Sequence, residues 1–308
     1  MTLTTITKFS RQPRAGLISA CVVTRNACAL LKNYLESLIN SINETYDLEI
    51  IVVDNDSNDD TALMLRRDFP NAQYIFQQPG IGFTKGINLA ISASRGDLIL
   101  IATPSTMVIA DAVPQLIQYL KNHHEVGVVG PKVLNLDGTT QYSSKKMPHP
   151  KIALLHTLRL FGIKNANKTL NEYFLYDYIV EEPILVTSLT MSLLLTRRAV
   201  FEDVGFLDEN LFVWASDVDW CYNVEKSKWK QVFLPNIAVY HMRNSVSKKQ
   251  PFANLVHYHR DLKTFYRKHY AKDGSFLENL FWEILLQIRF LFQIARYLFV
   301  KHDNYSYY

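Results

Sequence analysis

The stretch LEIIVVDNDSNDDT, residues 48–61, combines the two features that decide the fold of this 308-residue chain. Its first half, 48–54, is an apolar run rich in β-branched residues, which predicts a buried strand. From Asp54 onward the stretch is polar throughout, as expected where a strand ends in a turn that leads into a helix. The stretch therefore predicts one strand–turn–helix unit with a carboxylate at the end of the strand.

Similar units lie on both sides of this stretch. The pattern predicts further strands at 17–24, 72–76, 97–102 and 126–131, and amphipathic helices at about 30–39, 60–68 and 84–94. Fully apolar strands that alternate with helices are typical of an α/β fold with a mainly parallel sheet covered on both faces. Ligands bind such sheets at the carboxyl ends of the strands. This rule places 24–26, 54–57 and 103–105 on one edge. After about 135, the stretch DGTTQYSSKKMPHP predicts a loop, and the last 60 or so residues have a helical pattern.

The bulk composition is that of an ordinary globular protein, with 48% hydrophobic and 20% charged residues. A net charge of +4 does not require nucleic acid as a partner, although it suits anionic small molecules or a membrane surface. The three cysteines, Cys21, Cys28 and Cys221, form neither a disulfide framework nor a zinc motif. Residues 1–16 lack the apolar core of a signal peptide, and no uncharged apolar run is long enough to span a bilayer. We therefore expect a cytoplasmic protein with free thiols.

Asp54 is the candidate ligand at the end of the second strand. A carboxylate in this position can accept hydrogen bonds from a base N–H or a ribose hydroxyl. The residues after it can equally cap the next helix, with Ser57 or Asn58 as the N-cap and acidic residues in the first turn. We expect both: Asp54 contacts a ligand, and residues 56–61 shape the turn and the cap.

The stretch PGIGFTKGINLAI, residues 79–91, is a glycine-rich turn that runs into a helix. Such a turn can bring backbone N–H groups close to a phosphate or a sugar. It lacks the G-x-G-x-x-G spacing of a dinucleotide-binding fingerprint. A tight loop without a ligand has the same pattern.

The stretch FLDENLFVWASDVDWCYNVEKSKWK, residues 206–230, places Asp217 and Asp219 two positions apart among aromatic residues. On a helix these carboxylates point in different directions, so one can face a cleft while the other caps the helix or pairs locally. A carboxylate near Trp214 and Trp220 can have a pKa raised to suit a general base. The alternative is a helix start at which acidic residues favour the dipole.

The stretch PNIAVYHMRNSVSKK, residues 235–249, predicts a strand that ends at His241. The imidazole of His241 can be either a hydrogen-bonded surface group or a ligand. The cations behind it, Arg243, Lys248 and Lys249, can meet a diphosphate.

Taken in order, seven segments resemble family 2 glycosyltransferases of the GT-A fold, especially the rhamnosyltransferase-like branch that builds bacterial surface polysaccharides. They are CVVTRN, IIVVDNDSNDDT, GIGFTKGINLAI, VGVVGPKVLNLDG, RRAVFEDVGFLDENLF, SDVDWC and VYHMRNS. The resemblance covers roughly residues 17–247, and seven segments in this order are highly specific for the fold.

The resemblance implies an inverting transfer of a sugar from a nucleoside diphosphate to an acceptor hydroxyl. Asp217 matches the general base of the family's Glu-Asp-x-Asp motif, and His241 matches a position that helps to bind metal or pyrophosphate. Arg243 and Lys248 are expected at the diphosphate. The residues expected at the nucleotide-sugar are Thr24, Asn26, Asp54, Gly82, Lys85, Asn88, Thr103 and Ser105.

Four positions depart from the family pattern. Thr103-Pro104-Ser105-Thr106 stands where the branch usually has Asn-Pro-Asp-Thr, so that Ser105 replaces a metal-binding carboxylate. Ser216 replaces the glutamate before Asp217, Asn223 replaces an arginine, and Met191 replaces a glycine of the acceptor-side strand.

The hydroxyl of Ser105 is a poor substitute for a carboxylate that holds Mg²⁺. Positive side chains can neutralise a leaving diphosphate instead, and Lys85, Arg243, Lys248 and Lys249 are the candidates. We expect a transferase that needs little or no metal, with any Mg²⁺ or Mn²⁺ held mainly by the donor diphosphate. Two alternatives remain open. One is an impaired domain that binds a glycan or a partner without turnover, and the other is a nucleotidyltransferase of similar topology.

We expect a GT-A domain over 1–245 and a helical extension over 246–308. Within 276–308, apolar residues recur at helical spacing, while Arg289, Gln293 and Arg296 share another face. Such a helix suits peripheral contact with the inner face of the cell membrane through 276–300. It suits equally a helix docked on its own body or on a second subunit of a homo-oligomer. The expected donor is a UDP- or dTDP-sugar, carrying a sugar such as rhamnose, and the expected acceptor is a glycan or a lipid-linked molecule.

Overall fold

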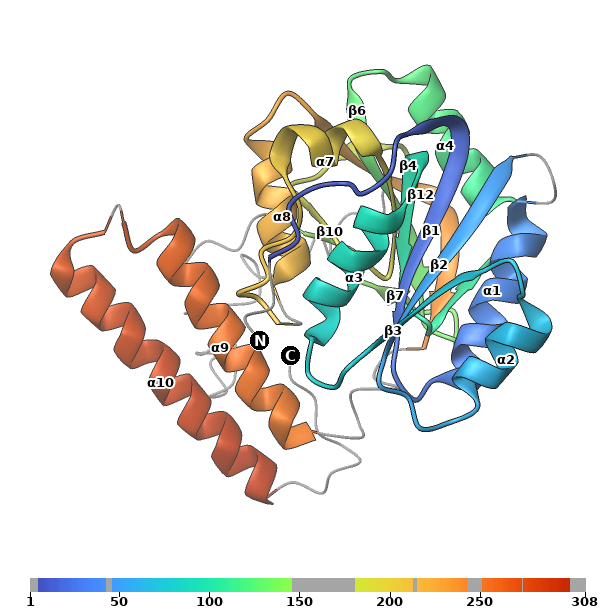
Figure 1. The fold of residues 1–308 in the computed structure, drawn as a ribbon. Coiled ribbons are helices and arrows are strands. Elements are labelled where there is room, and N and C mark those ends of the chain that lie inside the picture. The colour runs from blue at the N-terminus through green and yellow to red at the C-terminus, as the bar shows by residue number, and fades with distance from the viewer. Residues whose placement is uncertain are drawn as a thin grey trace.

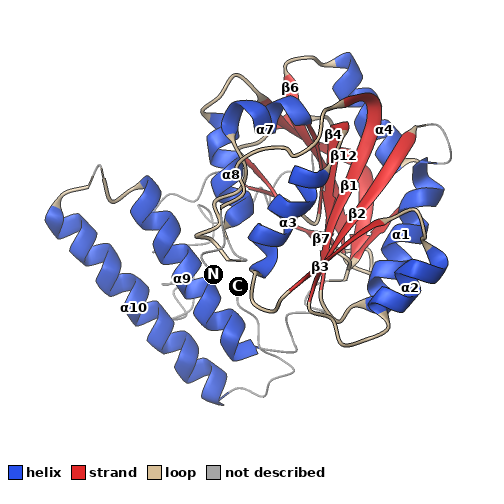
Figure 2. Ribbon diagram, viewed as in Figure 1, coloured by secondary structure: helices blue, strands red, loops and turns tan. Residues whose placement is uncertain are grey.

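The computed structural model describes residues 5–42, 46–145, 181–212, 215–242, 251–272 and 274–299. Its strands are β1 (Arg14–Thr24), β2 (Asp47–Asn55), β3 (Gln73–Gln77), β4 (Gly96–Ala102), β5 (Thr106–Val108), β6 (Val126–Leu134), β7 (Thr140–Gln141), β8 (Ser144–Lys145), β9 (Ile184–Leu185), β10 (Ser188–Leu189), β11 (Leu193–Arg197) and β12 (Lys230–His241). Its helices are α1 (Cys28–Ile42), α2 (Thr61–Asp68), α3 (Gly82–Ala93), α4 (Ala112–Asn122), α7 (Arg198–Val204), α8 (Ser216–Glu225), α9 (Pro251–His269) and α10 (Phe276–Phe299). Figures 1 and 2 show a central sheet between helices, with α9 and α10 to one side.

The central sheet has the order β3-β2-β1-β4-β11-β6-β12-β5. The first four of these strands are parallel neighbours, and β6 and β12 are also parallel. β11 runs antiparallel between β4 and β6, and β5 runs antiparallel to β12. All six strands expected from the sequence are present, including the strand that ends at His241, and the sheet is mixed.

The antiparallel strand β11 is the feature that the apolar pattern did not reveal. A strand buried on both faces has the same apolar composition in either direction. The direction of a strand is fixed by the edge of the sheet at which the chain enters it. A crossover helix would bring the chain back to the edge where β4 begins, but the chain enters β11 at the edge where β4 ends. The stretch after 135, predicted as a loop, contains the short strands β7 and β8, and 146–150 lies outside the described residues.

Two layers of helices cover the sheet, as the pattern predicted. Successive side chains of β1 alternate between them: Ile18, Ala20 and Val22 join the core under α1, α2 and α4, whereas Cys21 and Val23 join the core under α3, α7 and α8. Burial of β1 on both faces therefore follows directly from its apolar run.

The turn between β2 and α2 is longer than the capping prediction allowed. Asp60 occupies the N-cap position of α2, so the predicted N-cap at Ser57 or Asn58 is wrong. Asp59 Oδ1 accepts hydrogen bonds from Thr61 N–H (3.2 Å) and Oγ1 (2.5 Å), and Oδ2 accepts one from Cys28 N–H (3.0 Å) at the start of α1. Burial alone would raise the pKa of Asp59, but these bonds outweigh it and hold the pKa below its ordinary value. The Asp59 carboxylate thus accepts hydrogen bonds from the first residues of both α1 and α2.

The C-terminal extension is a pair of helices, and α9 lies between α10 and the rest of the protein (Figure 1). The expected boundary at 245/246 lies outside the described residues. In the part of the chain that the structure describes, no helix combines the length and hydropathy needed to cross a membrane.

Leu100 offers a test of the core. Its side chain is fully buried in the middle of β4. Leu100→Ala is expected to lower the free energy of unfolding by ~2–5 kcal/mol, because it removes apolar contacts and leaves a cavity. The matched change Leu63→Ala, at an exposed position of α2, is expected to stay within ~0.5 kcal/mol. Urea unfolding of both variants measures the difference, and equal effects would contradict this assignment of the core.

Candidate functional site

Asp54 lies at the end of β2, in register with Thr24 at the end of β1. Its side chain is 1% exposed. Asp54 Oδ1 accepts a hydrogen bond from Ser57 N–H (2.9 Å), and Oδ2 accepts one from the Tyr74 hydroxyl (2.8 Å). The carboxylate is therefore fixed from both sides at the edge that the sequence predicted.

Tyr74 is a residue of this site that sequence reasoning missed. Burial, together with its hydrogen bond to Asp54, raises the pKa of the Tyr74 phenol to about 12. The phenol thus remains a proton donor to Asp54 at neutral pH. The only signal in the sequence was its position in a strand neighbouring β2, and a tyrosine there is also an ordinary strand residue.

Asn26 joins the loops after β1 and β2. It adopts a positive φ of 49°, which asparagine tolerates better than most residues. Its N–H donates to Ser57 Oγ (2.9 Å), and its Oδ1 accepts from Asn58 N–H (2.7 Å). Thr24, Asn26 and Asp54 are therefore brought together as expected.

Two buried polar atoms at this edge have no hydrogen-bond partner within the described structure: Thr24 Oγ1 and Asn55 Oδ1. An unsatisfied buried polar atom costs about 1–3 kcal/mol. Such atoms call for a bound partner, and a small polar ligand is one that would satisfy them.

Ser105 and His241 form a second cluster on the same edge. β5 pairs with the end of β12, with Thr106 in register with His241. Ser105 Oγ lies 3.1 Å from His241 Nε2, and the Ser105 carbonyl accepts a hydrogen bond from Met242 N–H (2.9 Å). Thr103 Oγ1 lies 3.3 Å from Ser105 Oγ, which extends the chain of hydroxyls. The structure thus joins directly the two positions at which the resemblance implied a metal.

Gln141 determines the tautomer of His241. Gln141 Nε2 donates to the carbonyl of His241 (2.7 Å) and to Asn135 Oδ1 (2.7 Å), so Gln141 Oε1 is the atom that lies 3.0 Å from His241 Nδ1. An amide oxygen only accepts, so Nδ1 carries the proton. In the neutral ring, Nε2 is then the acceptor that faces the Ser105 hydroxyl.

The donors at Ser105 and His241 do not fit a typical Mg²⁺ site. They are one hydroxyl and one imidazole, whereas Mg²⁺ prefers carboxylate oxygens together with water and phosphate. Among the residues that the structure describes, no group of three or more His, Cys, Asp and Glu side chains could hold a metal ion. Within the described residues, this part of the edge therefore offers one hydroxyl and one imidazole rather than a carboxylate cage for a divalent cation.

The glycine-rich turn at the start of α3 is covered by Phe212. Gly82 has a φ of 74°, and a Cβ there would lie 2.7 Å from the Phe212 ring and 2.8 Å from its carbonyl oxygen. Thr84 donates to that carbonyl from N–H (3.3 Å) and Oγ1 (3.3 Å). Only glycine accommodates both the φ and the close approach at position 82.

Asn88 and Lys85 have partners inside the protein. Asn88 is fully buried, and its amide exchanges two hydrogen bonds with the backbone of Leu207 (2.9 and 3.1 Å). Asn88 therefore holds segment 205–212 in place, and its expected contact with the donor stays a prediction. Lys85 Nζ lies 3.6 Å from Glu209 Oε2, so this cation is partly neutralised.

Asp217 and Asp219 diverge at the start of α8, as predicted. Asp217 is half-buried, and its Oδ1 accepts from Val218 N–H (2.9 Å). Asp219 is 1% exposed, and it binds Lys268 Nζ (2.9 Å) and His269 Nε2 (2.6 Å). Of the two carboxylates, Asp217 is the one with access to solvent.

Side chains on the inner face of α8 hold the helix against the protein. The Trp220 indole donates to the Gly205 carbonyl (3.0 Å) and stacks on Phe201 at 4.6 Å. Burial raises the pKa of the Cys221 thiol to about 12, so this cysteine stays neutral and unreactive. Met191, which replaces the expected glycine, is buried in the same core.

Helix α9 ties together the parts of the site. Lys268 also binds Asp208 (2.7 Å), and its hydrogen bonds to Asp208 and Asp219 raise its pKa despite its partial burial. Asp261, fully buried, accepts from Phe212 N–H (3.0 Å), and Phe212 stacks on His257 at 4.3 Å. The extension therefore holds both α8 and the segment over Gly82.

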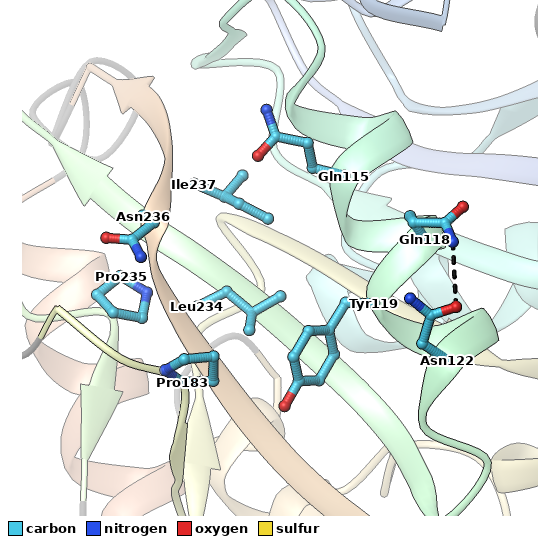
Figure 3. A pocket seen from close by; sticks show the side chains of 9 residues that line it. All are labelled: Gln115, Gln118, Tyr119, Asn122, Pro183, Leu234, Pro235, Asn236 and Ile237. Atoms are coloured by element: carbon cyan, nitrogen blue, oxygen red, sulfur yellow. Dashed lines mark hydrogen bonds between the residues drawn. The ribbon is translucent and has the colours of Figure 1, made fainter.

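A pocket of about 330 Å³ lies elsewhere, between α4 and the middle of β12 (Figure 3). Gln118 and Asn122 on its wall are joined by a hydrogen bond of 3.1 Å. It opens on the face covered by α1 and α4, and no expected site residue lines it.

Four residues named in the sequence analysis lie outside the described residues: Arg243, Lys248, Lys249 and Trp214.

The family model of glycosyl transferase family 2 matches residues 19–205. This match spans well over half of the chain, and the chain therefore belongs to glycosyl transferase family 2. It is rhamnosyltransferase-like within that family. An N-acetylglucosaminyl-diphospho-decaprenol L-rhamnosyltransferase of Mycobacterium tuberculosis is 23% identical over 262 residues, which are 81% of this chain and 83% of the relative.

Solved structures support the GT-A fold. S. aureus TarS in complex with UDP-GlcNAc matches with a TM-score of 0.54 and 15% identity, over 90% of this chain and 72% of TarS. The mannosyltransferase PcManGT from Pyrobaculum calidifontis, in complex with GDP-Man and Mn²⁺, matches with a TM-score of 0.52 and 16% identity, over 96% of this chain and 78% of its own.

Asp219 offers a test of the contact between α8 and α9. Asp219→Ala is expected to lower the free energy of unfolding by ~1–3 kcal/mol, because His269 loses its acceptor and Lys268 keeps only Asp208. Glu225→Ala, an exposed change on the same helix, is expected to stay within ~0.5 kcal/mol. Chemical denaturation compares the two variants, and a silent Asp219→Ala would show that the pair does not hold α8.

Proposed function

We propose that this family 2 protein is an inverting transferase that moves a sugar from a UDP- or dTDP-sugar to a hydroxyl of a glycan or a lipid-linked acceptor. The observation that carries the proposal is the division of roles on α8. Asp219 is buried in a charge pair, whereas Asp217, two residues before it, is solvent-accessible. The relative from M. tuberculosis is named for an acceptor on diphospho-decaprenol and for the sugar L-rhamnose, which supports this choice of acceptor and donor.

In the proposed reaction, Asp217 is the general base. It takes the proton of the acceptor hydroxyl while the hydroxyl oxygen attacks the anomeric carbon from the face opposite the diphosphate. The bond from the anomeric carbon to the diphosphate oxygen breaks, and its electron pair leaves with the nucleoside diphosphate. The link from Asp219 to Lys268 and His269 holds the helix on which the base sits.

The nucleotide is proposed to bind at the ends of β1 and β2. Asp54 is fixed there by Ser57 and Tyr74, with Thr24 and Asn26 beside it. The unpartnered buried oxygens of Thr24 and Asn55 support a polar ligand at this edge. Gly82 is proposed to let the donor-side loop approach the sugar.

The diphosphate is proposed to leave with little or no help from a metal. Ser105 and His241 bind each other where a carboxylate and a metal were expected from the family pattern. Arg243 and Lys248 are proposed to supply the positive charge.

A lipid-linked acceptor would place the reaction at the inner face of the cell membrane.

Asp217→Asn tests the base. The change keeps the shape of the side chain but removes its basicity, so turnover is expected to fall by ~10²–10⁴-fold while nucleotide binding persists. Glu225→Gln is the matched control, because it neutralises an exposed carboxylate on the same helix. Transfer assays and a thermal-shift panel with UDP, dTDP and GDP measure the two properties. Wild-type turnover in Asp217→Asn would refute the assignment.

Removal of divalent metal tests the role of Ser105. Turnover of the natural protein is expected to survive EDTA. Ser105→Asp restores a carboxylate beside His241 and is expected to make turnover respond to Mn²⁺ or Mg²⁺, whereas Ser105→Asn is not. Collapse of the natural protein's activity in EDTA, with recovery in Mn²⁺ or Mg²⁺, would overturn this part of the proposal.

The second candidate is a glycan- or partner-binding domain without turnover. It is favoured by Ser216, a buried serine at the position of the motif glutamate. This alternative predicts ligand-induced thermal stabilisation without consumption of any nucleotide-sugar, and the same thermal-shift panel, combined with a donor-consumption assay, separates the two candidates.

A further inference from the structure

Helix α10 carries apolar residues on both of its sides, and those of its outer side are exposed to solvent. Arg289 and Gln293, polar residues in the middle of the helix, are 7% and 4% exposed. The apolar residues of the opposite side are between 46% and 73% exposed. We call them the outer stripe: Leu277, Leu280, Phe281, Ile284, Ile288, Leu291 and Leu298. On the inner side, Leu286 is buried and Phe290 packs against Leu255, so α9 covers the inner apolar residues and leaves the outer stripe uncovered.

The outer stripe is continuous along the helix. Its members recur at steps of one, three, four or seven residues, which keeps them on one side. From Leu277 to Leu298 it extends about 32 Å at 1.5 Å per residue. None of its members is charged. Contiguous apolar surface of this extent is uncommon on a soluble protein and indicates a binding surface.

Contacts with α9 fix the direction in which the outer stripe faces. Glu283 binds Lys263 (2.6 Å) and Arg267 (2.6 Å) of α9, and Phe290 stacks on His259 at 4.2 Å. The Arg289 guanidinium lies 5.1 Å from the centre of the Tyr258 ring. Charged and aromatic side chains therefore lock the inner side of α10 to α9, and the helix cannot turn its apolar side inward without breaking them.

The positive charge of the chain is concentrated in the part of the sequence that contains this helix. Residues 243–308 contain 11 Lys and Arg against 5 Asp and Glu, whereas residues 1–242 contain 22 against 24. The net charge is thus +6 in the last 66 residues and −2 in the rest. Arg260, Arg267 and Lys272 are exposed on α9 and just after it.

We propose that the outer stripe of α10 binds the surface of a lipid bilayer that contains anionic lipids. The apolar side chains enter the boundary between headgroups and acyl chains, and the surrounding cations meet lipid phosphates. A second copy of this chain is the less favourable occupant, because symmetric contact through α10 would bring two segments of charge +6 together. Lipid binding goes beyond sugar transfer and needs neither donor nor acceptor.

Helix α9 connects the outer stripe of α10 to the segments around Asp217. One side of α9 packs on α10, while His257, Asp261, Lys268 and His269 hold Phe212, Asp208 and Asp219. A bilayer bound to the outer stripe is therefore connected to the segments around Asp217 through α10 and α9 alone, so an acceptor anchored in that bilayer would lie on the same side of the protein as α8.

Sedimentation of the full-length protein with vesicles tests the proposal. We expect binding to vesicles of phosphatidylcholine and phosphatidylglycerol, weaker binding to phosphatidylcholine alone, and a decrease at high salt. The double variant Ile284→Asp, Ile288→Asp is expected to bind ~10-fold or more weakly. Its matched control is Leu63→Asp, Leu185→Asp, which places the same charges at exposed apolar positions away from α10 and is expected to bind as the natural protein does.

A charge variant and a mass measurement complete the test. Lys272→Glu alters an exposed cation and leaves the outer stripe intact, so weaker binding to the anionic vesicles alone is expected, even if the aspartate variant folds poorly. Sedimentation velocity without lipid is expected to show the same mass for all variants. The proposal is overturned if the natural protein ignores anionic vesicles, if the stripe and charge variants bind unchanged, or if a lipid-free dimer dissociates in the stripe variant.

Discussion

Parallel pairing of β1 with β2 on one side and β4 on the other is the constraint on which the candidate site depends. Three parallel strands must end at the same edge, so residues that are far apart in the sequence meet there. Thr24 and Asp54 are in register, and Thr103 follows the last residue of β4. Because β1 is buried on both faces, this alignment is held by the core of the whole protein.

The same edge brings Ser105 and His241 together. The end of β12 pairs with β5 and brings His241 beside Ser105. Gln141 fixes the proton on Nδ1 and leaves Nε2 as an acceptor. The hydrogen bond between this hydroxyl and this imidazole differs chemically from a pair of metal ligands. The position at which Ser105 departs from the family pattern is therefore also the position at which Ser105 contacts His241.

The C-terminal extension is part of the site's framework, and its two sides have opposite characters. Toward the body, α9 offers charge to buried Asp219 and a carboxylate to the backbone of Phe212. Away from the body, α10 offers an apolar surface without charge. Loss of the extension would remove the partners of both the Asp219 carboxylate and the Phe212 N–H, so the extension does more than cover the surface.

The sequence by itself determined the apolar strands, the strand that ends at His241, the helices between the strands and the presence of polar residues at the strand ends. These features follow from local periodicity and from burial, which each segment records in its own composition. It also indicated that Asp217 and Asp219 diverge, because the angle between two positions on a helix is fixed. Only the tertiary structure decided the direction of β11, the pairing of Ser105 with His241, the internal use of Asn88 and the side on which α10 exposes its apolar residues. Each of these depends on contacts between segments about 100 residues or more apart, or on which neighbour a helix packs against, and no local pattern contains that information.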